Sequence, residues 1–193
     1  IVDQKIADDF VKKFGDKAKN LPLGDPRKPE PVVLGSVIGM NTVEHCNALI
    51  DDALAKGAKL VCGEKATTTL MPATVLDHVT PAMRIYHEET FGPVKCIVRV
   101  NGVEEAVACA NDNEYGLSAS VFGADIARAM NVARRIDSGI CHVNGPTVHD
   151  EAQMPFGGVK GSGMGRFGGR AGIAEFTDLR WITVQTQPRH YPF

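Results

Sequence analysis

The sequence predicts an α/β protein with a mostly parallel, twisted sheet and helices on both faces. Strand-like and helix-like segments alternate through residues 94–143, and a helix between two strands leaves enough chain for parallel pairing. The 193 residues are 44% hydrophobic and 23% charged, which is typical of a globular protein with a buried core. No apolar run approaches the roughly 20 residues of a membrane helix, so the sequence predicts a soluble protein without membrane contact.

The first third of the chain predicts two helices separated by an extended segment. Apolar residues at helical spacing predict a helix over 3–20, with Asp3 as its N-cap. Four prolines within 21–31 predict an irregular surface crossing. A second helix is expected from Asn41 to Gly57, where a left-handed cap residue is needed. We expect this helix to bury Val43, Cys46, Leu49, Ile50 and Leu54.

Two short strands are expected next, over 60–62 and 73–76, and then the pattern becomes regular. It predicts strands over 94–100, 118–122 and 140–143, and helices over 103–111 and 125–136. Binding sites in such sheets lie beyond the carboxyl ends of the strands. The loop 144–155, which follows the last of these strands, is therefore a candidate site. Alternating residues over 181–186 predict a terminal strand that pairs in its own sheet or with another subunit.

Charge and cysteine content narrow the function. Lysine and arginine total 21 against 23 acidic residues, a formal net charge of −2, which argues against a nucleic-acid partner and favours a small, mildly polar ligand. The five cysteines are widely spaced and form no Cys-x-x-Cys pair. This pattern predicts a reduced, cytoplasmic protein without a zinc site.

A glycine-rich string occupies residues 156–169, and Gly163, Gly165 and Gly168 satisfy the pattern Gly-x-Gly-x-x-Gly. A dinucleotide-binding role for that pattern requires a preceding strand and a following βαβ unit. Only 25 residues (169–193) follow Gly168, which is too few. A tightly packed loop, in which backbone approaches backbone, is the better interpretation.

A second motif, Glu-Glu-Thr-Phe-Gly-Pro at 88–93, precedes the strand expected over 94–100. An acidic pair of this kind is commonly a solvated turn. The alternative is a carboxylate that accepts hydrogen bonds from ligand hydroxyls, next to the Phe91 ring, which could pack on a flat ligand. Adjacent side chains of an extended chain point in different directions, so at most one of Glu88 and Glu89 would face a site.

The loop after residue 143 raises the question of a metal site. His142, His149, Asp150 and Glu151 lie close in sequence, but strand alternation and the absence of a histidine pair at i, i+4 argue against a metal. A loop that lines a pocket is favoured instead. None of the five cysteines has a setting that marks a nucleophile.

Three strings together resemble the NAD(P)-dependent aldehyde dehydrogenases, and within them the bacterial branch that acts on aromatic aldehydes such as salicylaldehyde, benzaldehyde and vanillin. The strings are Glu-Glu-Thr-Phe-Gly-Pro at 88–93, Tyr-Gly-Leu-Ser-Ala-Ser-Val-Phe at 115–122, and Pro-Phe-Gly-Gly-Val-Lys at 155–160. The resemblance covers the whole chain but only the carboxyl-terminal part of such an enzyme. It implies that residues 1–177 belong to the catalytic domain and that 178–193 form an oligomerisation strand and tail.

The resemblance also implies what lies elsewhere. The nucleophilic cysteine, the general-base glutamate, the oxyanion asparagine and the phosphate-binding loop of the family are expected before Ile1. No catalytic residue and no metal ligand is therefore expected in this chain, and the chain alone is predicted to be inactive. A non-catalytic assembly or binding fragment is the alternative interpretation.

By similarity, Glu89 corresponds to the carboxylate that binds the nicotinamide ribose of NAD, and Phe91 to a ring that packs near the nicotinamide; NADP is left open. Phe156 corresponds to an aromatic wall of the aldehyde tunnel, with pocket residues on the neighbouring loop at Asn144, Thr147 and His149. The terminal strand implies a homo-oligomer.

One departure from the family pattern concerns the second helix. Many relatives carry glutamine and lysine that touch the ribose, at the positions where this chain has Thr42 and His45. A role of that helix in binding the cofactor is therefore in doubt.

Overall fold

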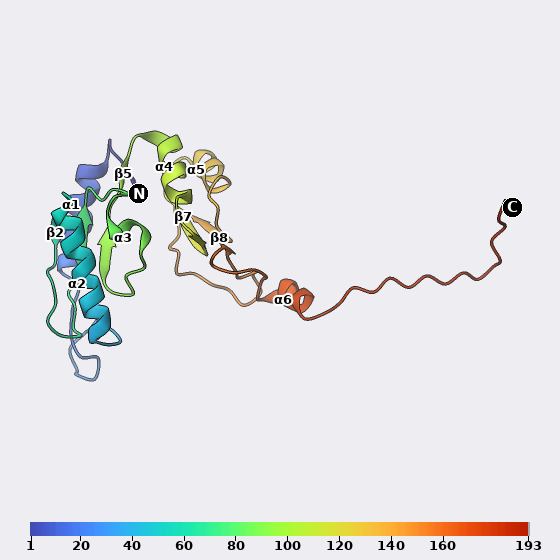
Figure 1. Cartoon of the computed structure of the whole chain (residues 1–193), viewed down its shortest axis with the longest axis horizontal. Helices are drawn as coiled ribbons and strands as arrows, with labels where there is room; N and C mark the ends of the chain where they lie inside the picture. The colour runs from blue at the N-terminus through green and yellow to red at the C-terminus, as the bar shows by residue number, and fades with distance from the viewer. Residues whose placement is uncertain (193) are drawn as a thin grey trace. The chain divides into compact units, whose positions relative to one another are not determined.

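The computed structural model describes residues 1–192, and the chain divides into two compact units, 1–113 and the residues from 114 onward (Figure 1). Both units combine helices with short strands, so the predicted α/β class is confirmed. Within residues 1–192, no helix has the length and apolar content needed to cross a membrane.

The first unit alternates helices and strands along the chain. In order it contains β1 (Val2–Asp3), α1 (Ala7–Lys19), α2 (Met40–Ala55), β2 (Lys59–Cys62), β3 (Thr74–Asp77), α3 (Arg84–His87), β4 (Val94–Cys96), β5 (Arg99–Val100) and α4 (Gly102–Asn111).

The larger sheet of this unit has the strand order β2-β3-β4. Strands β3 and β4 run parallel, whereas β2 and β3 are antiparallel. Residues 63–73 join β2 to β3 without a helix, so the chain reverses its direction there. Strands β1 and β5 form a separate parallel pair. The sheet β2-β3-β4 is therefore mixed. The expectation of a mostly parallel sheet holds only for individual strand pairs, such as β3 with β4 and β1 with β5.

Helices cover both faces of this sheet, as the sequence predicts. Every residue of β3 is buried. Leu76 packs in one core cluster with residues of α2, whereas its neighbour Val75 packs in another with Ala7 and Ala18 of α1. Consecutive strand residues point to opposite faces, so α2 and α1 lie on opposite sides of β3.

The predicted first helix begins too early. Residues 2 and 3 form β1 instead, because the Val2 N–H donates to the Val98 carbonyl (2.9 Å) and the Gln4 N–H donates to the Val100 carbonyl (2.8 Å). Asp3 is therefore not the N-cap of α1. Its carboxylate accepts a hydrogen bond from the Gly102 N–H at the start of α4.

The second helix ends as predicted, with Gly57 in the left-handed region at φ +101°. Its buried face is nearly as expected, but Leu54 is 38% exposed, and the preceding Ala53 is fully buried in its place. The strand expected over 94–100 is also divided. Strand β4 pairs with β3, whereas β5 turns away to pair with β1.

The second unit contains β6 (Tyr115–Gly116), β7 (Ser118–Val121), α5 (Ile126–Ala133), β8 (Ile140–Val143), β9 (Val159–Lys160) and α6 (Gly169–Glu175). The predicted strand-helix-strand unit is confirmed, since β7 and β8 run parallel over four residue pairs. Asp125 caps α5 by accepting a hydrogen bond from the Arg128 N–H (3.0 Å). Helix α5 is shorter than predicted, and the antiparallel pair β6–β9 was not predicted.

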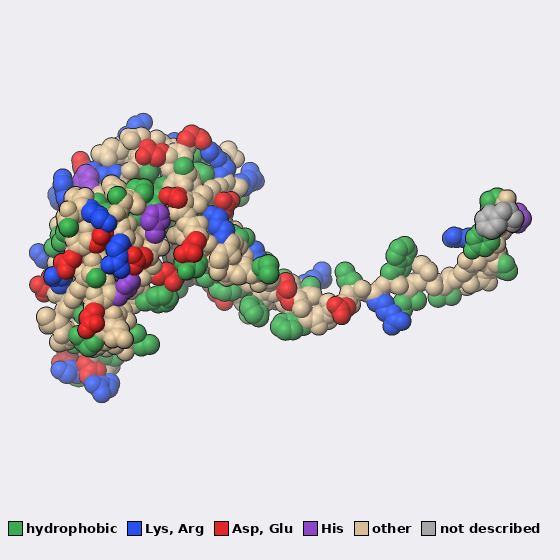
Figure 2. All heavy atoms as spheres, in the orientation of Figure 1, with side chains coloured by type: hydrophobic (Ala, Val, Ile, Leu, Met, Phe, Trp, Pro, Cys, Tyr) green, Lys and Arg blue, Asp and Glu red, His purple; other side chains and the backbone are tan. Residues whose placement is uncertain are grey.

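The segment after α6 differs from its prediction. Residues 178–192 form no helix or strand, so the terminal strand expected over 181–186 is not present in this chain by itself. Apolar side chains are spread along the segment (Figure 2). Trp181 is 91% exposed, and Leu179 and Val184 are exposed as well.

Candidate functional site

The loop of residues 88–93 lies between α3 and β4, and its two acidic residues differ in their surroundings. The Arg84 guanidinium donates to both oxygens of the Glu88 carboxylate (2.7 and 2.9 Å), and this contact lowers the Glu88 pKa. Among residues 1–192, no group gives the exposed Glu89 carboxylate a hydrogen bond or an ion pair. Of the acidic pair, Glu89 is thus the one with its hydrogen-bonding capacity free.

Phe91 lies in this loop and is 79% exposed. Its backbone has φ +46°, a left-handed conformation that residues other than glycine seldom adopt. A large exposed ring in a strained backbone is an unusual arrangement, and such arrangements are concentrated at binding sites.

Helix α2 holds the loop in place through two consecutive residues. His45 Nε2 lies 2.8 Å from the Glu89 carbonyl oxygen, and the Cys46 thiol donates to the Thr90 carbonyl at 3.2 Å. Burial raises the pKa of the Cys46 thiol, so it keeps its proton for this bond. A side chain at Gly92 would meet Cys46 Sγ at 2.6 Å, so only glycine allows the loop to pack this closely against α2.

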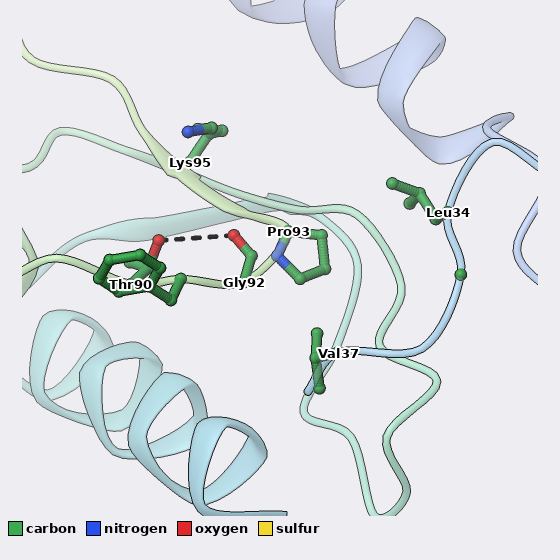
Figure 3. Close-up of a pocket in the computed structure, with 8 residues that line it drawn as sticks. Leu34, Val37, Thr90, Gly92, Pro93 and Lys95 are labelled. Atoms are coloured by element: carbon green, nitrogen blue, oxygen red, sulfur yellow. Dashed lines mark hydrogen bonds between the residues drawn. The ribbon is translucent and has the colours of Figure 1, made fainter. Parts of the chain in front are cut away.

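A cavity of about 470 Å³ lies beside this loop (Figure 3). Its walls are largely apolar, and Lys95 supplies the charged group of the lining. The lining residues are Leu34, Gly35, Val37, Thr90, Phe91, Gly92, Pro93 and Lys95. The cavity can therefore accept a flat, mostly apolar group against Phe91.

The second candidate region is the loop after β8. Asn144, the first residue of this loop, has a structural role. Asn144 adopts φ +57°. Its side-chain oxygen accepts from the Gly123 N–H (2.8 Å), and its amide donates to the Gly123 carbonyl (2.9 Å). The Thr147 carbonyl accepts from Ser118 Oγ (3.3 Å). Both contacts anchor the loop to the chain around β7.

His149 and Phe156 lie together on the lining of a cavity of about 350 Å³, whereas Asn144 and Thr147 are not part of that lining. The His149 ring stands edge-on to His142, with 5.6 Å between ring centroids. His142 Nε2 is buried without a hydrogen-bond partner among the described residues. The sequence suggested His142 only as a metal ligand. The described residues contain no group of three His, Cys, Asp or Glu side chains that could hold a metal ion.

The glycine-rich string packs backbone against backbone, in agreement with its simpler interpretation. A side chain at Gly139 would overlap the Gly157 carbonyl. Arg166, to which the sequence assigned no role, donates from Nη1 to the carbonyls of Gly158 (2.8 Å) and Gly165 (2.7 Å). Phe156 and Phe167 pair through their backbones, which fixes the main chain at Phe156.

The four cysteines with shifted pKa values are poor nucleophiles in this chain. All five cysteines are free thiols, and burial raises the pKa of Cys46, Cys62, Cys96 and Cys141. Cys109 accepts a hydrogen bond from the Tyr86 hydroxyl at 3.5 Å. Catalytic cysteines are activated by a lowered pKa, and these four thiols are shifted in the opposite direction.

Known proteins are similar to this chain in both sequence and fold. Residues 1–182 match the model of the aldehyde dehydrogenase family. Vanillin dehydrogenase from Pseudomonas sp. strain HR199 is 56% identical over 187 residues, which cover 97% of this chain and 39% of that protein. The chain spans about two fifths of the length of the curated relatives it matches.

Solved structures agree with this match. The salicylaldehyde dehydrogenase of Pseudomonas putida G7, solved with salicylaldehyde, superposes with a TM-score of 0.93 at 50% identity over 100% of this chain and 40% of its own. An aldehyde dehydrogenase of Mycobacterium tuberculosis, solved with NAD⁺, has a TM-score of 0.84 at 31% identity over 92% of this chain and 37% of its own. The chain therefore belongs to the aldehyde dehydrogenase family.

Proposed function

We propose that this chain is the carboxyl-terminal part of an aromatic aldehyde dehydrogenase, which oxidises an aldehyde to its carboxylate with a nicotinamide nucleotide. The observation that carries the proposal is that one loop holds both the free Glu89 carboxylate and the exposed Phe91 ring. The similarity to vanillin and salicylaldehyde dehydrogenases supports an aromatic substrate.

The loop fits the nicotinamide end of such a nucleotide. An unpaired carboxylate can accept hydrogen bonds from both hydroxyls of a ribose, and an exposed aromatic ring can pack against a flat ring. When bound, such a nucleotide would supply the hydride acceptor for the oxidation. In this proposal Glu89 orients the ribose and Phe91 limits the space beside the nicotinamide. NAD is the nucleotide we propose, as in the NAD⁺ complex of the mycobacterial relative.

We assign the aldehyde to the cavity of the second unit, where Phe156 and His149 lie on one lining. An aromatic wall favours an aromatic ring over a short aliphatic chain. The raised pKa values of Cys46, Cys62, Cys96 and Cys141 support a nucleophile located outside this chain. By analogy with the family, we also propose that the general base lies outside this chain. Five free thiols also support a reducing, cytoplasmic setting.

A complete enzyme that contains this chain tests the proposal directly. Salicylaldehyde, benzaldehyde and propanal are supplied with NAD, and reduced nicotinamide is followed by its absorbance. We expect turnover of both aromatic aldehydes with higher kcat/KM than for propanal. A preference for propanal would remove the aromatic assignment, and no reduction of NAD with any aldehyde would remove the dehydrogenase assignment.

An assembly role is a second proposal, carried by the exposed tail. Leu179, Trp181 and Val184 present apolar side chains on a segment that, over residues 178–192, forms no helix or strand, and such a segment can add as a strand to the sheet of another subunit. Light scattering of the complete enzyme with and without residues 178–193 tests this. We expect the truncation to reduce the oligomer size; an unchanged mass would exclude the tail as the contact.

A further inference from the structure

We propose that His45 is a positioning residue for Glu89, which holds the main chain of the nucleotide-binding loop and does not itself contact the nucleotide. The inference rests on the proposed function of Glu89. It gives α2 a different role from the one that the family pattern implies, because the side chain at this position binds the protein backbone.

The contact joins two parts of the chain that are far apart in sequence. His45 Nε2 lies 2.8 Å from the Glu89 carbonyl oxygen, 44 residues away. A carbonyl oxygen only accepts hydrogen bonds, so Nε2 carries the proton and donates it. This bond fixes the peptide that leaves Glu89 and therefore the direction in which the Glu89 side chain departs from the backbone.

The following residues show why the loop needs an external contact. Phe91 has φ +46°, and a strained backbone persists only where its surroundings hold it. Cys46 secures the Thr90 carbonyl and packs against Gly92. His45 provides the only side-chain hydrogen bond to Glu89 itself among the described residues. Loss of this donor should release the Glu89 end of the loop and loosen the residues that follow it.

A matched pair of variants separates the donor from the bulk of the side chain. Glutamine and methionine have similar length and shape, but only glutamine can donate to the Glu89 carbonyl. His45→Gln should therefore keep the position of the loop, and His45→Met should lose it. Glu44→Gln is the control for changes to the surface of α2, because Glu44 is exposed on the same helix.

Two measurements on the complete enzyme test these variants. Calorimetric titration with NAD in the absence of aldehyde gives the Kd, and amide hydrogen exchange without nucleotide reports on residues 90–92. For His45→Met we expect a Kd raised about three- to tenfold, as for the loss of one hydrogen bond, and faster exchange at residues 90–92. His45→Gln and Glu44→Gln should match the wild type in both measurements, and the KM for the aldehyde should stay unchanged in all three.

Including Glu89→Gln distinguishes a failure of the positioning role of His45 from a failure of the proposed role of Glu89. If Glu89→Gln weakens NAD binding and His45→Met changes neither Kd nor exchange, the positioning role is wrong and the proposed function stands. If Glu89→Gln leaves NAD binding unchanged, the proposed role of Glu89 fails, and the positioning role fails with it. If His45→Gln is as impaired as His45→Met, the donor is not what matters, and the inference is overturned.

Discussion

Arg99 and Asp77 form a two-point ion pair inside the first unit. Arg99 Nε donates to one oxygen of the Asp77 carboxylate (3.0 Å), and Nη2 donates to the other (2.6 Å). The Asp77 side chain is only 4% exposed and that of Arg99 12%. The pair joins β5 to β3, and a further bond from Arg99 Nη1 to Asp8 (2.7 Å) extends it to α1.

Removing the cation from this pair should destabilise the chain strongly. Arg99→Met would leave the Asp77 carboxylate buried without its partner, which costs about 3–5 kcal/mol. Urea unfolding of wild type and variant measures the difference. Arg27→Met is the control, because the Arg27–Asp25 pair is exposed and should contribute little. Equal losses in both variants would show that the Arg99 pair is no stronger than a surface pair.

The Asp77 carboxylate should also make the free energy of unfolding depend on pH. Burial alone would raise the pKa of Asp77, but hydrogen bonds from Arg99 and the His78 N–H, together with the Arg99 charge, outweigh it and lower the pKa below 3.8. A carboxyl whose pKa is lowered by folding stabilises the folded state above its unfolded pKa, and this stabilisation is lost as the pH falls through the lowered value. The free energy of unfolding should therefore fall below about pH 4. Asp77→Asn should show a shallower fall over that range, and identical slopes would contradict this account.

Phe156 predicts a selective effect on substrates in the complete enzyme. Packing between aromatic rings contributes about 0.5–1.5 kcal/mol beyond burial, so Phe156→Ala should lower kcat/KM for benzaldehyde more than for propanal. Phe176→Ala removes an exposed ring and serves as the control. If both aldehydes lose activity equally and the melting temperature falls, Phe156 is a folding contact and not a pocket wall.

The chain alone should not oxidise aldehydes. Burial raises the pKa of four of its five cysteines, and the proposed nucleophile lies outside it. Incubating the purified chain with benzaldehyde and NAD tests this expectation. Turnover that disappears on mutation of Cys141 or Cys62 would contradict it.

Local signals predicted the fold well where contacts are short in sequence. The unit of β7, α5 and β8 followed from its periodicity, and the end of α2 followed from Gly57. The start of α1 was missed because β1 is defined by pairing with β5, about a hundred residues later. No periodicity in the first ten residues can report such a contact.

The candidate site shows the same division. Glu89 and Phe91 were proposed as site residues from the family resemblance, and the residues themselves left a solvated turn open as an alternative. The structure adds that Glu88 is paired with Arg84 and that α2 holds the loop. The contact between His45 and the Glu89 carbonyl spans 44 residues and involves a backbone atom, so no side-chain pattern could indicate it.

The role of Glu89 is the central claim, and the kinetics of Glu89→Gln in the complete enzyme test it most directly. A hydrogen bond to a charged group contributes about 1.5–3 kcal/mol. The variant should therefore lower kcat/KM for NAD roughly ten- to a hundredfold at an unchanged melting temperature, because the side chain is exposed. Glu88→Gln, which removes the charge of the neighbouring acid, should stay close to the wild type. Wild-type kinetics in Glu89→Gln would contradict the account and remove this loop from the nucleotide site.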